Sequence, residues 1–84
     1  MRIIFVEEAW EDYLHWQQID KAMLRKINAL IKEIIRSPFE GTGKPEALKE
    51  NLSGFWSRRI NLEHRLVYKV DLDSVVIVQC RYHY

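Results

Sequence analysis

The apolar residues of this chain change their spacing once, from a helical period to a period of two, and this change sets the fold class. The spacing i, i+4, i+7, i+8 and i+11, which places side chains on one face of a helix, joins Met23, Ile27, Leu30, Ile31 and Ile34. After Gly54 apolar and polar residues alternate, as they do in strands with one buried face. The 84 residues therefore predict one α+β domain spanning residues 1–84.

The N-terminal part predicts a strand followed by a first helix. Arg2–Val6 is short and rich in β-branched and aromatic residues, which favours a strand. Glu7 and Glu8 suit a first helical turn, where the helix dipole favours acids. Helical spacing then joins Trp10, Tyr13 and Leu14, and extends to Gln17 if the helix continues. We expect this helix to end before Asp20.

A second helix should begin after Asp20, because aspartate is a good N-cap. It should end at about Arg36, since Ser37 precedes Pro38 and a residue before proline is disfavoured in a helix. The stretch 39–44 contains two glycines, which predicts a loop. A plain connector is favoured over a nucleotide-binding loop, because the stretch lacks the Gly-Lys-Ser/Thr ending of such a loop.

Three strands should follow, with short connections that suit an antiparallel meander. Their expected ranges are Phe55–Ile60, Glu63–Val70 and Val75–Tyr82, joined by residues 61–62 and 71–74. The order β-α-α-β-β-β predicts helices packed on one face of a single sheet.

Because successive strand residues point to opposite faces, parity sorts the side chains of these strands. The even-numbered face is apolar and should face the helices: Trp56, Ile60, Leu66, Tyr68, Val70, Val76, Val78, Cys80 and Tyr82. The odd-numbered face gathers charged residues at one end, with apolar ones further along: Arg59, Glu63, Arg65, Arg81 and His83, then Val67, Val75 and Ile77.

Two interpretations of the charged cluster remain open. It is either a solvated surface with Glu63–Arg65 and Glu63–Arg59 ion pairs, worth about 0–1 kcal/mol each, or a phosphate site. Arginine binds phosphate through a bidentate fork, and histidine exchanges protons near neutral pH. Glu46 and Lys49 would share a side if residues 45–52 form a helical turn, either as a surface pair or as part of this site.

Composition narrows the alternatives. The single cysteine, Cys80, allows no internal disulfide, and its apolar neighbours favour a buried thiol over a nucleophile. The chain shows neither the h-region of a signal peptide nor an apolar run near the roughly 20 residues of a membrane span, so we expect a cytoplasmic protein without a membrane partner. His15, His64 and His83 lack metal-ligand spacing, so no metal or cofactor is expected, and His64 should be structural.

The net charge of +1 gives no general argument for nucleic-acid binding. Longer segments, however, match a known family in order: Gly43–Lys49, Asn51–Ile60, Glu63–Tyr68 and Cys80–Tyr84, together with Glu8, Trp10, Asp12, Tyr13, Trp16 and Asp20. Through these residues the chain resembles, from end to end, the YoeB toxins of the RelE/YoeB superfamily.

The resemblance implies a fold like that of microbial ribonucleases, with an antiparallel sheet flanked by two helices. It implies a ribosome-dependent endonuclease that cuts mRNA in the A site and is inhibited by a cognate YefM-like antitoxin. In that family the positions matching Glu46, Arg65 and His83 carry catalysis. Supporting positions match Lys49, Arg59 and Glu63, and the terminal Tyr84 is needed, through either its ring or its carboxylate.

This resemblance suggests a mechanism that needs no metal or cofactor, because the 2′-hydroxyl of RNA can attack its own phosphodiester. Glu46 is then the candidate base and His83 the candidate acid, with a 2′,3′-cyclic phosphate and a 5′-hydroxyl as products. A homodimer is plausible from the aromatic residues Trp10 and Trp16. Two alternatives stay open: a non-catalytic binding module and a ribosome-independent ribonuclease.

Overall fold

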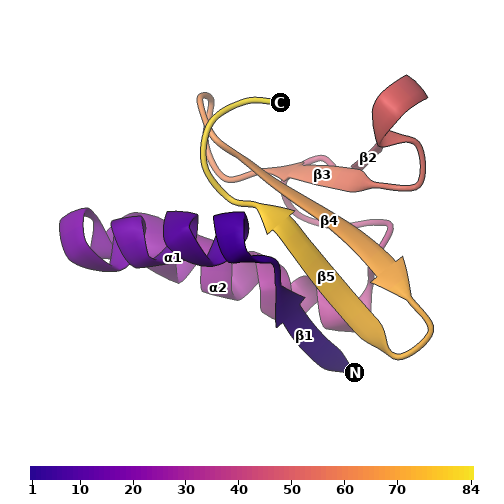
Figure 1. Cartoon of the computed structure of the whole chain (residues 1–84), viewed down its shortest axis with the longest axis horizontal. Coiled ribbons are helices and arrows are strands. Elements are labelled where there is room, and N and C mark those ends of the chain that lie inside the picture. Colours follow the sequence, from indigo (N-terminus) through magenta and orange to yellow (C-terminus); the bar gives the residue numbers. More distant parts are fainter.

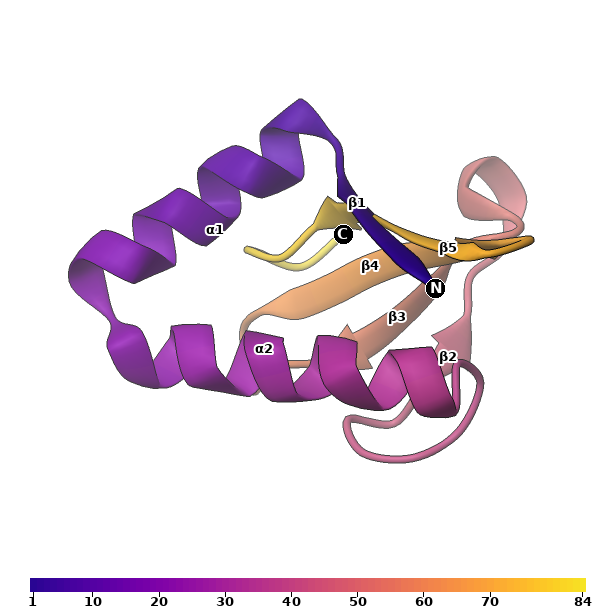
Figure 2. The ribbon, with the colours of Figure 1, turned by 90° about the horizontal axis from the view of Figure 1, so that it is seen from below.

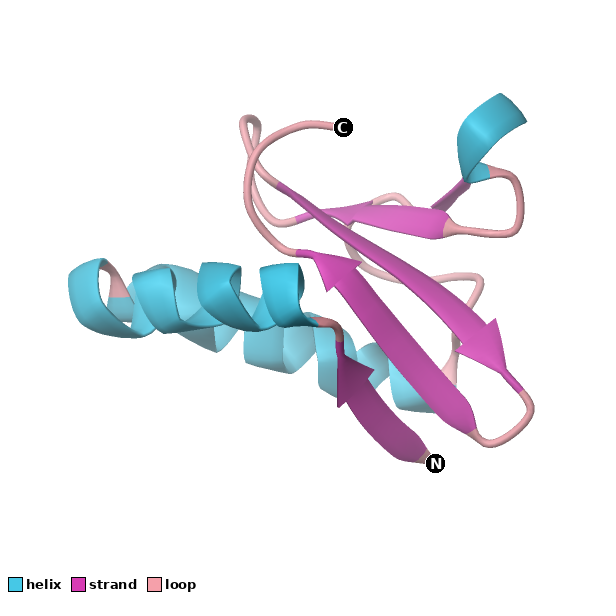
Figure 3. Ribbon diagram, in the orientation of Figure 1, coloured by secondary structure: helices cyan, strands magenta, loops and turns pink.

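The computed structural model describes all 84 residues and confirms the α+β class (Figures 1 and 3). The elements in chain order are β1 (Arg2–Phe5), α1 (Glu7–Ile19), α2 (Lys21–Arg36), β2 (Glu46–Ala47), a short 3₁₀ helix (Glu50–Leu52), β3 (Trp56–Arg59), β4 (Arg65–Asp71) and β5 (Ser74–Gln79). Neither helix is long and apolar enough to cross a membrane.

The strands form one sheet in the order β1-β5-β4-β3-β2. The predicted antiparallel meander is β3-β4-β5. β1, the predicted N-terminal strand, adds to β5 in parallel. The sheet is wider than predicted, because β2 adds to β3 in antiparallel orientation. Both helices lie on the same side of the sheet (Figure 2), and their buried residues form one core with those of β4 and β5 and with Ile60, which follows β3.

The second helix forms where the sequence predicts it, for local reasons. The Asp20 carboxylate accepts hydrogen bonds from the amides of Ala22 and Met23, which satisfies two donors at the helix start. The five residues at helical spacing are all buried. Burying each such side chain contributes about 1.5–3 kcal/mol, so this helix is held mainly by its apolar face.

The predicted faces are wrong for the first half of β5. Val75 and Ile77 are fully buried, whereas Val76 and Val78 are only half-buried. Asp71 pairs with Ser74 across a two-residue turn, so paired residues in this hairpin have numbers of opposite parity. Since paired residues share a sheet face, the odd residues of β5 join the even residues of β4 in the core.

A bulge then reverses this change of parity. Tyr68 pairs with Ile77 but Val67 pairs with Gln79, so Val78 is an extra residue in β5. Cys80 consequently returns to the core, as predicted. The strand ends at Gln79 rather than at Tyr82, and Tyr82 is exposed instead of lying in the core.

A fully buried arginine on the core side of β3 joins the loop after α2 to the sheet. Arg58 pairs with Glu33 at 2.7 Å between Nη1 and Oε1. Its guanidinium also donates to the Tyr68 hydroxyl and to three carbonyls of the loop, those of Ser37, Glu40 and Thr42. Every nitrogen of the buried guanidinium therefore has an acceptor, and the loop is held against β3.

The carboxylate of Glu33 completes this network. The amide and the hydroxyl of Thr42 donate to it at 2.6 and 2.9 Å, and these bonds, with Arg58 beside them, lower the pKa of Glu33. Gly41 and Gly43 both have positive φ, and a Cβ on Gly43 would lie 2.9 Å from the Arg59 carbonyl oxygen. The close approach of the loop to β3 thus requires glycine at position 43.

We predict that Arg58→Met lowers the free energy of unfolding by about 2–4 kcal/mol, because buried carbonyls lose a charged donor. The matched control is Arg59→Met at the adjacent, exposed position, where a change within about 0.5 kcal/mol is expected. Urea denaturation followed by tryptophan fluorescence measures both. Equal stability of the two variants would contradict the role given to the buried network.

Candidate active site

A cavity of about 390 Å³ opens on the side of the sheet opposite the helices. Its walls come from four parts of the sequence. These are β2 with the loop before it, β3, β4 and the C-terminal tail. The lining residues are Lys44, Pro45, Glu46, Ser57, Arg59, Arg65, His83 and Tyr84. We refer to this cavity as the polar cleft.

The polar cleft brings together five of the seven residues that the sequence analysis singled out: Glu46, Arg59, Arg65, His83 and Tyr84. Lys49 and Glu63 do not line it. Lys49 is exposed at the start of the 3₁₀ helix. Glu63 is exposed in the turn before β4, where its carboxylate lies 3.6 Å from Nε2 of His64.

Glu46 reaches the cleft from a strand, so the helical turn that would place it on the same side as Lys49 does not form. It lies in β2 and pairs with Ser57 of β3. The Tyr84 hydroxyl donates to Glu46 Oε1 at 3.4 Å and accepts from the Ser57 hydroxyl at 3.3 Å. The terminal tyrosine therefore contacts the candidate base through its ring hydroxyl.

Arg65 is buried and held rigidly by the turn before its own strand. Its Nη1 donates to three carbonyls, those of Asn61, Leu62 and His64. Its Nε and Nη2 donate to no protein group, and the ion pair with Glu63 that a solvated surface would contain does not form. A guanidinium fixed on one side with donors left on the other is suited to bind an anion in the cleft.

The cleft has an excess of positive charge, although the whole chain carries only +1. Arg59 is exposed and has no acidic partner, so the pair with Glu63 is absent here too. Lys44, which the sequence analysis missed, also lines the cleft and adopts a positive φ of 52°. The only signal for it was its position two residues before Glu46. Lys44, Arg59 and Arg65 thus face a single acidic side chain, that of Glu46.

The tail that carries the last two cleft residues is anchored by α1. The Trp16 indole donates to the Cys80 carbonyl at 2.8 Å, and the Cys80 amide donates to Asp12 Oδ2 at 3.1 Å. Trp16 is 5% exposed, so its side chain packs in the core and does not form part of a free surface. Burial raises the pKa of Asp12, and the bond from Cys80 offsets part of this effect.

Beyond Cys80 the chain turns back over β4. Tyr82 has a φ of 67°, and its carbonyl accepts from the Arg65 amide at 2.9 Å while its amide donates to His64 Nδ1 at 2.7 Å. His83 and Tyr84 follow this turn directly, with their rings stacked 4.9 Å apart. His83 is exposed in the cleft, where it can exchange a proton with a bound molecule.

Cys80 belongs to the core and not to the cleft. Its thiol is fully buried, and burial, with the nearby Asp12 carboxylate, raises its pKa to about 12. The thiolate is the reactive form of cysteine. The expectation of a buried thiol is therefore confirmed.

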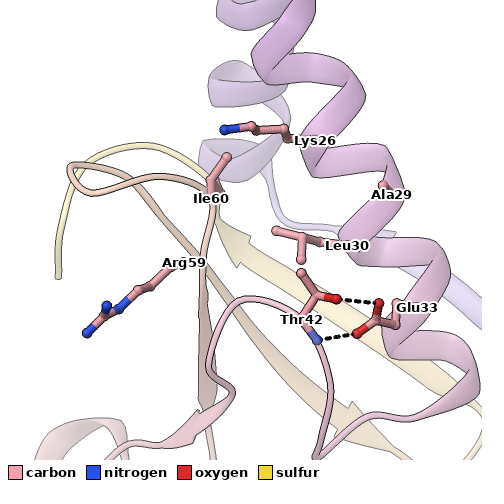
Figure 4. A pocket seen from close by; sticks show the side chains of 7 residues that line it. All are labelled: Lys26, Ala29, Leu30, Glu33, Thr42, Arg59 and Ile60. Carbon is pink, nitrogen blue, oxygen red and sulfur yellow. Dashed lines mark hydrogen bonds between the residues drawn. The ribbon is translucent and has the colours of Figure 1, made fainter.

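A second cavity, of about 340 Å³, lies between α2 and the end of β3 (Figure 4). Ala29, Leu30 and Ile60 give it an apolar lining. Its carboxylate, Glu33, is hydrogen-bonded to Thr42 and is already used by the network around Arg58. The side chain of Arg59 points away from α2 (Figure 4). This second cavity therefore offers no free acid–base pair.

The polar cleft holds the groups that acid–base chemistry on a phosphate ester requires. Glu46 supplies a carboxylate and His83 an imidazole, and the three cations can neutralise charge that develops on phosphate oxygens. No three His, Cys, Asp or Glu side chains gather closely enough to hold a metal ion. The chemistry that follows from these residues is proton transfer combined with electrostatic stabilisation.

Comparisons with known proteins find relatives that match the whole chain. Residues 5–84 match the model of a family described as the YoeB-like toxin of bacterial type II toxin–antitoxin systems. Toxin YoeB of Escherichia coli strain K12 is 64% identical over 84 residues, which cover all of both chains. The structure of a YoeB/ParE toxin from Agrobacterium tumefaciens superposes with a TM-score of 0.98 at 46% identity, again over all of both chains.

Two further structures come from Staphylococcus aureus. One is of a YoeB dimer, with a TM-score of 0.94, and the other is of a heterotetrameric YoeB–YefM toxin–antitoxin complex, with a TM-score of 0.93. In both, the matched chain is 55% identical and covers 100% of this chain and 98% of the other. YafQ from Escherichia coli, at 19% identity and a TM-score of 0.81, shares the fold.

We predict that Cys80 reacts with iodoacetamide at pH 8 about 10³-fold more slowly in the native protein than in urea, because its pKa rises from 9.0 to about 12 on folding. The same shift lowers stability as the pH rises from 9.0 towards about 12, since only the unfolded chain then releases this proton. Mass spectrometry follows alkylation, with Cys80→Ala as the unlabelled control. Equal rates in both states would contradict the buried thiol.

Proposed function

This chain belongs to the family of YoeB-like toxins of bacterial type II toxin–antitoxin systems, and on that premise we propose that it is an endoribonuclease that cuts mRNA in the ribosomal A site. The observation that carries the proposal is the polar cleft, in which a carboxylate, an imidazole and three cations meet. Cleavage of the message in the A site stops translation, which is how the proposed activity makes the protein a toxin.

The proposed reaction begins with proton transfer from the 2′-hydroxyl of the message. Glu46 accepts this proton as general base, and the 2′-oxygen attacks the adjacent phosphorus. The hydrogen bond from the Tyr84 hydroxyl orients the Glu46 carboxylate. Since a base must lie within reach of the proton that it removes, the placement of Glu46 on a strand of the sheet supports this role.

The reaction ends when the P–O5′ bond breaks. His83 donates a proton to the departing 5′-oxygen, so the products are a 2′,3′-cyclic phosphate and a 5′-hydroxyl. The exposure of His83 at the mouth of the cleft supports this role, because the leaving strand must have a path out. General acid and general base catalysis each contribute about 10²–10⁴-fold.

The cations stabilise the charge on the phosphate as it becomes five-coordinate. Arg65 is the central one, because three carbonyls fix its guanidinium before the substrate arrives, and preorganised charges stabilise a transition state most effectively. Arg59 and Lys44 bind the phosphate from the other walls. Lys49, outside the cleft, is proposed to contact the message beyond the scissile bond.

The dependence on the ribosome is supported by the charge of the chain. A ribonuclease that captures free RNA needs a broad basic surface, whereas this chain carries +1 and its cations gather locally. The ribosome would instead deliver the message and hold it in position. The same proposal places the protein in the cytoplasm, where translation occurs.

We also propose that a YefM-like antitoxin inhibits this protein and that the chain forms a homodimer. The Staphylococcus aureus relatives, one seen as a dimer and one bound to YefM, support both partners. Exposed apolar residues near the edge strand β1 offer surface for such contacts: Ile3, Ile4, Val6 and Trp10. An acidic segment of the antitoxin would suit the basic polar cleft.

The first test is cleavage of a short message by purified protein, with and without programmed ribosomes. We predict cleavage only on ribosomes, and a fall of about 10²-fold or more in single-turnover rate for both Glu46→Ala and His83→Gln. Lys69→Gln, on an exposed residue outside the cleft, is the matched surface control. Primer extension maps the cuts, and a product end that resists phosphatase until mild acid opens the ring identifies the cyclic phosphate.

The alternatives predict different results in the same assay. Efficient cleavage of naked RNA would keep the chemistry and remove the ribosome requirement. Binding of ribosomes without any cleavage, by the wild type as well as the variants, would favour a non-catalytic binding module. In that case the two substitutions would change only the affinity.

A second test uses the position of the chain termini. Tyr84 contacts Glu46 and Ser57 inside the cleft, whereas the N-terminus lies at the far end of the molecule (Figure 1). We predict that a short C-terminal tag abolishes growth inhibition in a plate assay, and that the same tag at the N-terminus does not. Equal toxicity of the two tagged proteins would contradict the proposed site.

A further inference from the structure

We propose that His64 is a positioning residue that fixes the C-terminal tail in the polar cleft through one acceptor atom, Nδ1. The inference rests on the proposed function for its effect on RNA cleavage, but its structural part stands independently. His64 does not line the cleft. It would act indirectly, because its Nδ1 binds the Tyr82 amide and Tyr82 in turn positions His83.

The hydrogen bond defines the state of the imidazole. The Tyr82 amide donates to Nδ1 at 2.7 Å, and a ring nitrogen accepts a hydrogen bond only when it carries no proton. The neutral ring therefore carries its proton on Nε2, which lies 3.6 Å from the Glu63 carboxylate. The exposed Glu63 thus faces the protonated side of the ring, and this placement favours the tautomer that leaves Nδ1 free to accept.

The ring itself is held in place on several sides. His64 is 8% exposed, and its ring packs edge-on against Trp16 with centroids 4.8 Å apart. Its amide donates to Asn61 Oδ1 at 2.7 Å, and its carbonyl accepts from the Ile60 amide at 3.0 Å. The acceptor atom is consequently presented to the tail from a rigid turn.

The turn of the tail depends on a small number of hydrogen bonds, and the bond to His64 is the shortest of them. Tyr82 adopts a φ of 67°, which is unfavourable for a residue with a bulky side chain. Its side chain is 56% exposed and lies under the Arg81 guanidinium rather than in the core. The main-chain bonds to His64 and to the Arg65 amide therefore help to define this turn. The Gln79 side chain also donates to it, at 2.8 Å to the Arg81 carbonyl and at 3.3 Å to the Tyr82 carbonyl.

The distance along the chain from this clamp to the cleft is one residue. His83 follows Tyr82 directly, so the direction of the Tyr82 backbone determines where the imidazole of His83 lies. If the amide of Tyr82 is released, His83 loses its fixed direction and Tyr84 is held only through the contacts of its hydroxyl with Ser57 and Glu46. Arg59 and Arg65 keep their positions. Loss of the acceptor should therefore reduce the rate of the chemical step and leave substrate binding largely intact.

The experiment compares two substitutions that differ in the acceptor. His64→Phe keeps a ring against Trp16 and removes the acceptor, whereas His64→Asn places an amide oxygen close to the position of Nδ1. The matched control is His15→Phe, because His15 packs on Trp16 at 5.0 Å between ring centroids but bonds nothing in the tail. Thermal denaturation of each variant first establishes that it is folded.

On programmed ribosomes we expect His64→Phe to lower kcat by about 10²-fold, the cost of a misplaced catalytic group, with KM little changed. His64→Asn should recover most of the lost rate, and His15→Phe should behave as wild type. Full activity of His64→Phe would overturn the proposal. Equal loss in His64→Phe and His64→Asn would overturn it as well, because packing rather than the acceptor would then matter.

A nuclear magnetic resonance measurement tests the clamp without RNA. The ¹⁵N shifts of His64 should show Nδ1 unprotonated and Nε2 protonated, and the ¹H–¹⁵N NOE of residues 82–84 should fall in His64→Phe but not in His64→Asn. A proton on Nδ1, or an equally ordered tail in His64→Phe, would overturn the proposal. If the wild type cleaves no RNA, the proposed function fails and this measurement alone decides the clamp.

Discussion

The burial of one positive charge, on Arg58, determines how the loop after α2 is folded. A guanidinium with no exposed surface must find an acceptor for each donor, because an unpaired buried charge is very costly. Glu33 supplies the opposite charge and the loop supplies three carbonyls. The loop is therefore drawn onto β3, and residues 44–46, which continue from it, arrive beside the same strand. One wall of the polar cleft thus depends on an ion pair on the helix side of the sheet.

The wall of the polar cleft that the C-terminal tail forms is also fixed by contacts on the helix side of the sheet. Asp12 and Trp16 of α1 hold the end of β5 from the helix side, and the tail then crosses to the opposite side, where it covers Ser57 and reaches Glu46. The helix side supplies buried contacts that fix the chain. The opposite side presents side chains that keep free donors and exposed surface. The contacts that fix the chain and the side chains available for chemistry thus lie on opposite sides of the sheet, although β3 and β4 contribute to both.

The sequence predicted the elements that depend on local contacts and missed those that depend on register. The α2 stripe and the Asp20 cap involve residues a few positions apart, so both were predicted correctly. Parity placed Arg59 and Arg65 on one face correctly, because the β3–β4 pairing keeps parity. It failed for Val75 and Ile77, since a single turn reverses it and a bulge restores it. Lys44 and the strand position of Glu46 could not be foreseen, because they follow from the long-range network of Arg58. The proposed catalytic roles came from the family resemblance, and geometry alone does not supply them.

The distribution of charge completes the physical account of the proposed function. Acidic residues crowd the start of α1 at Glu7, Glu8, Glu11 and Asp12, and cations gather at the polar cleft, so the two signs nearly cancel over the whole chain. Charges farther apart than about 8–10 Å are largely screened at physiological ionic strength. A message in the cleft would therefore respond to the local cations, whereas a distant RNA would be attracted only weakly. An enzyme with this charge distribution needs another macromolecule to bring its substrate close. The ribosome, which holds mRNA in a fixed position, would meet that need.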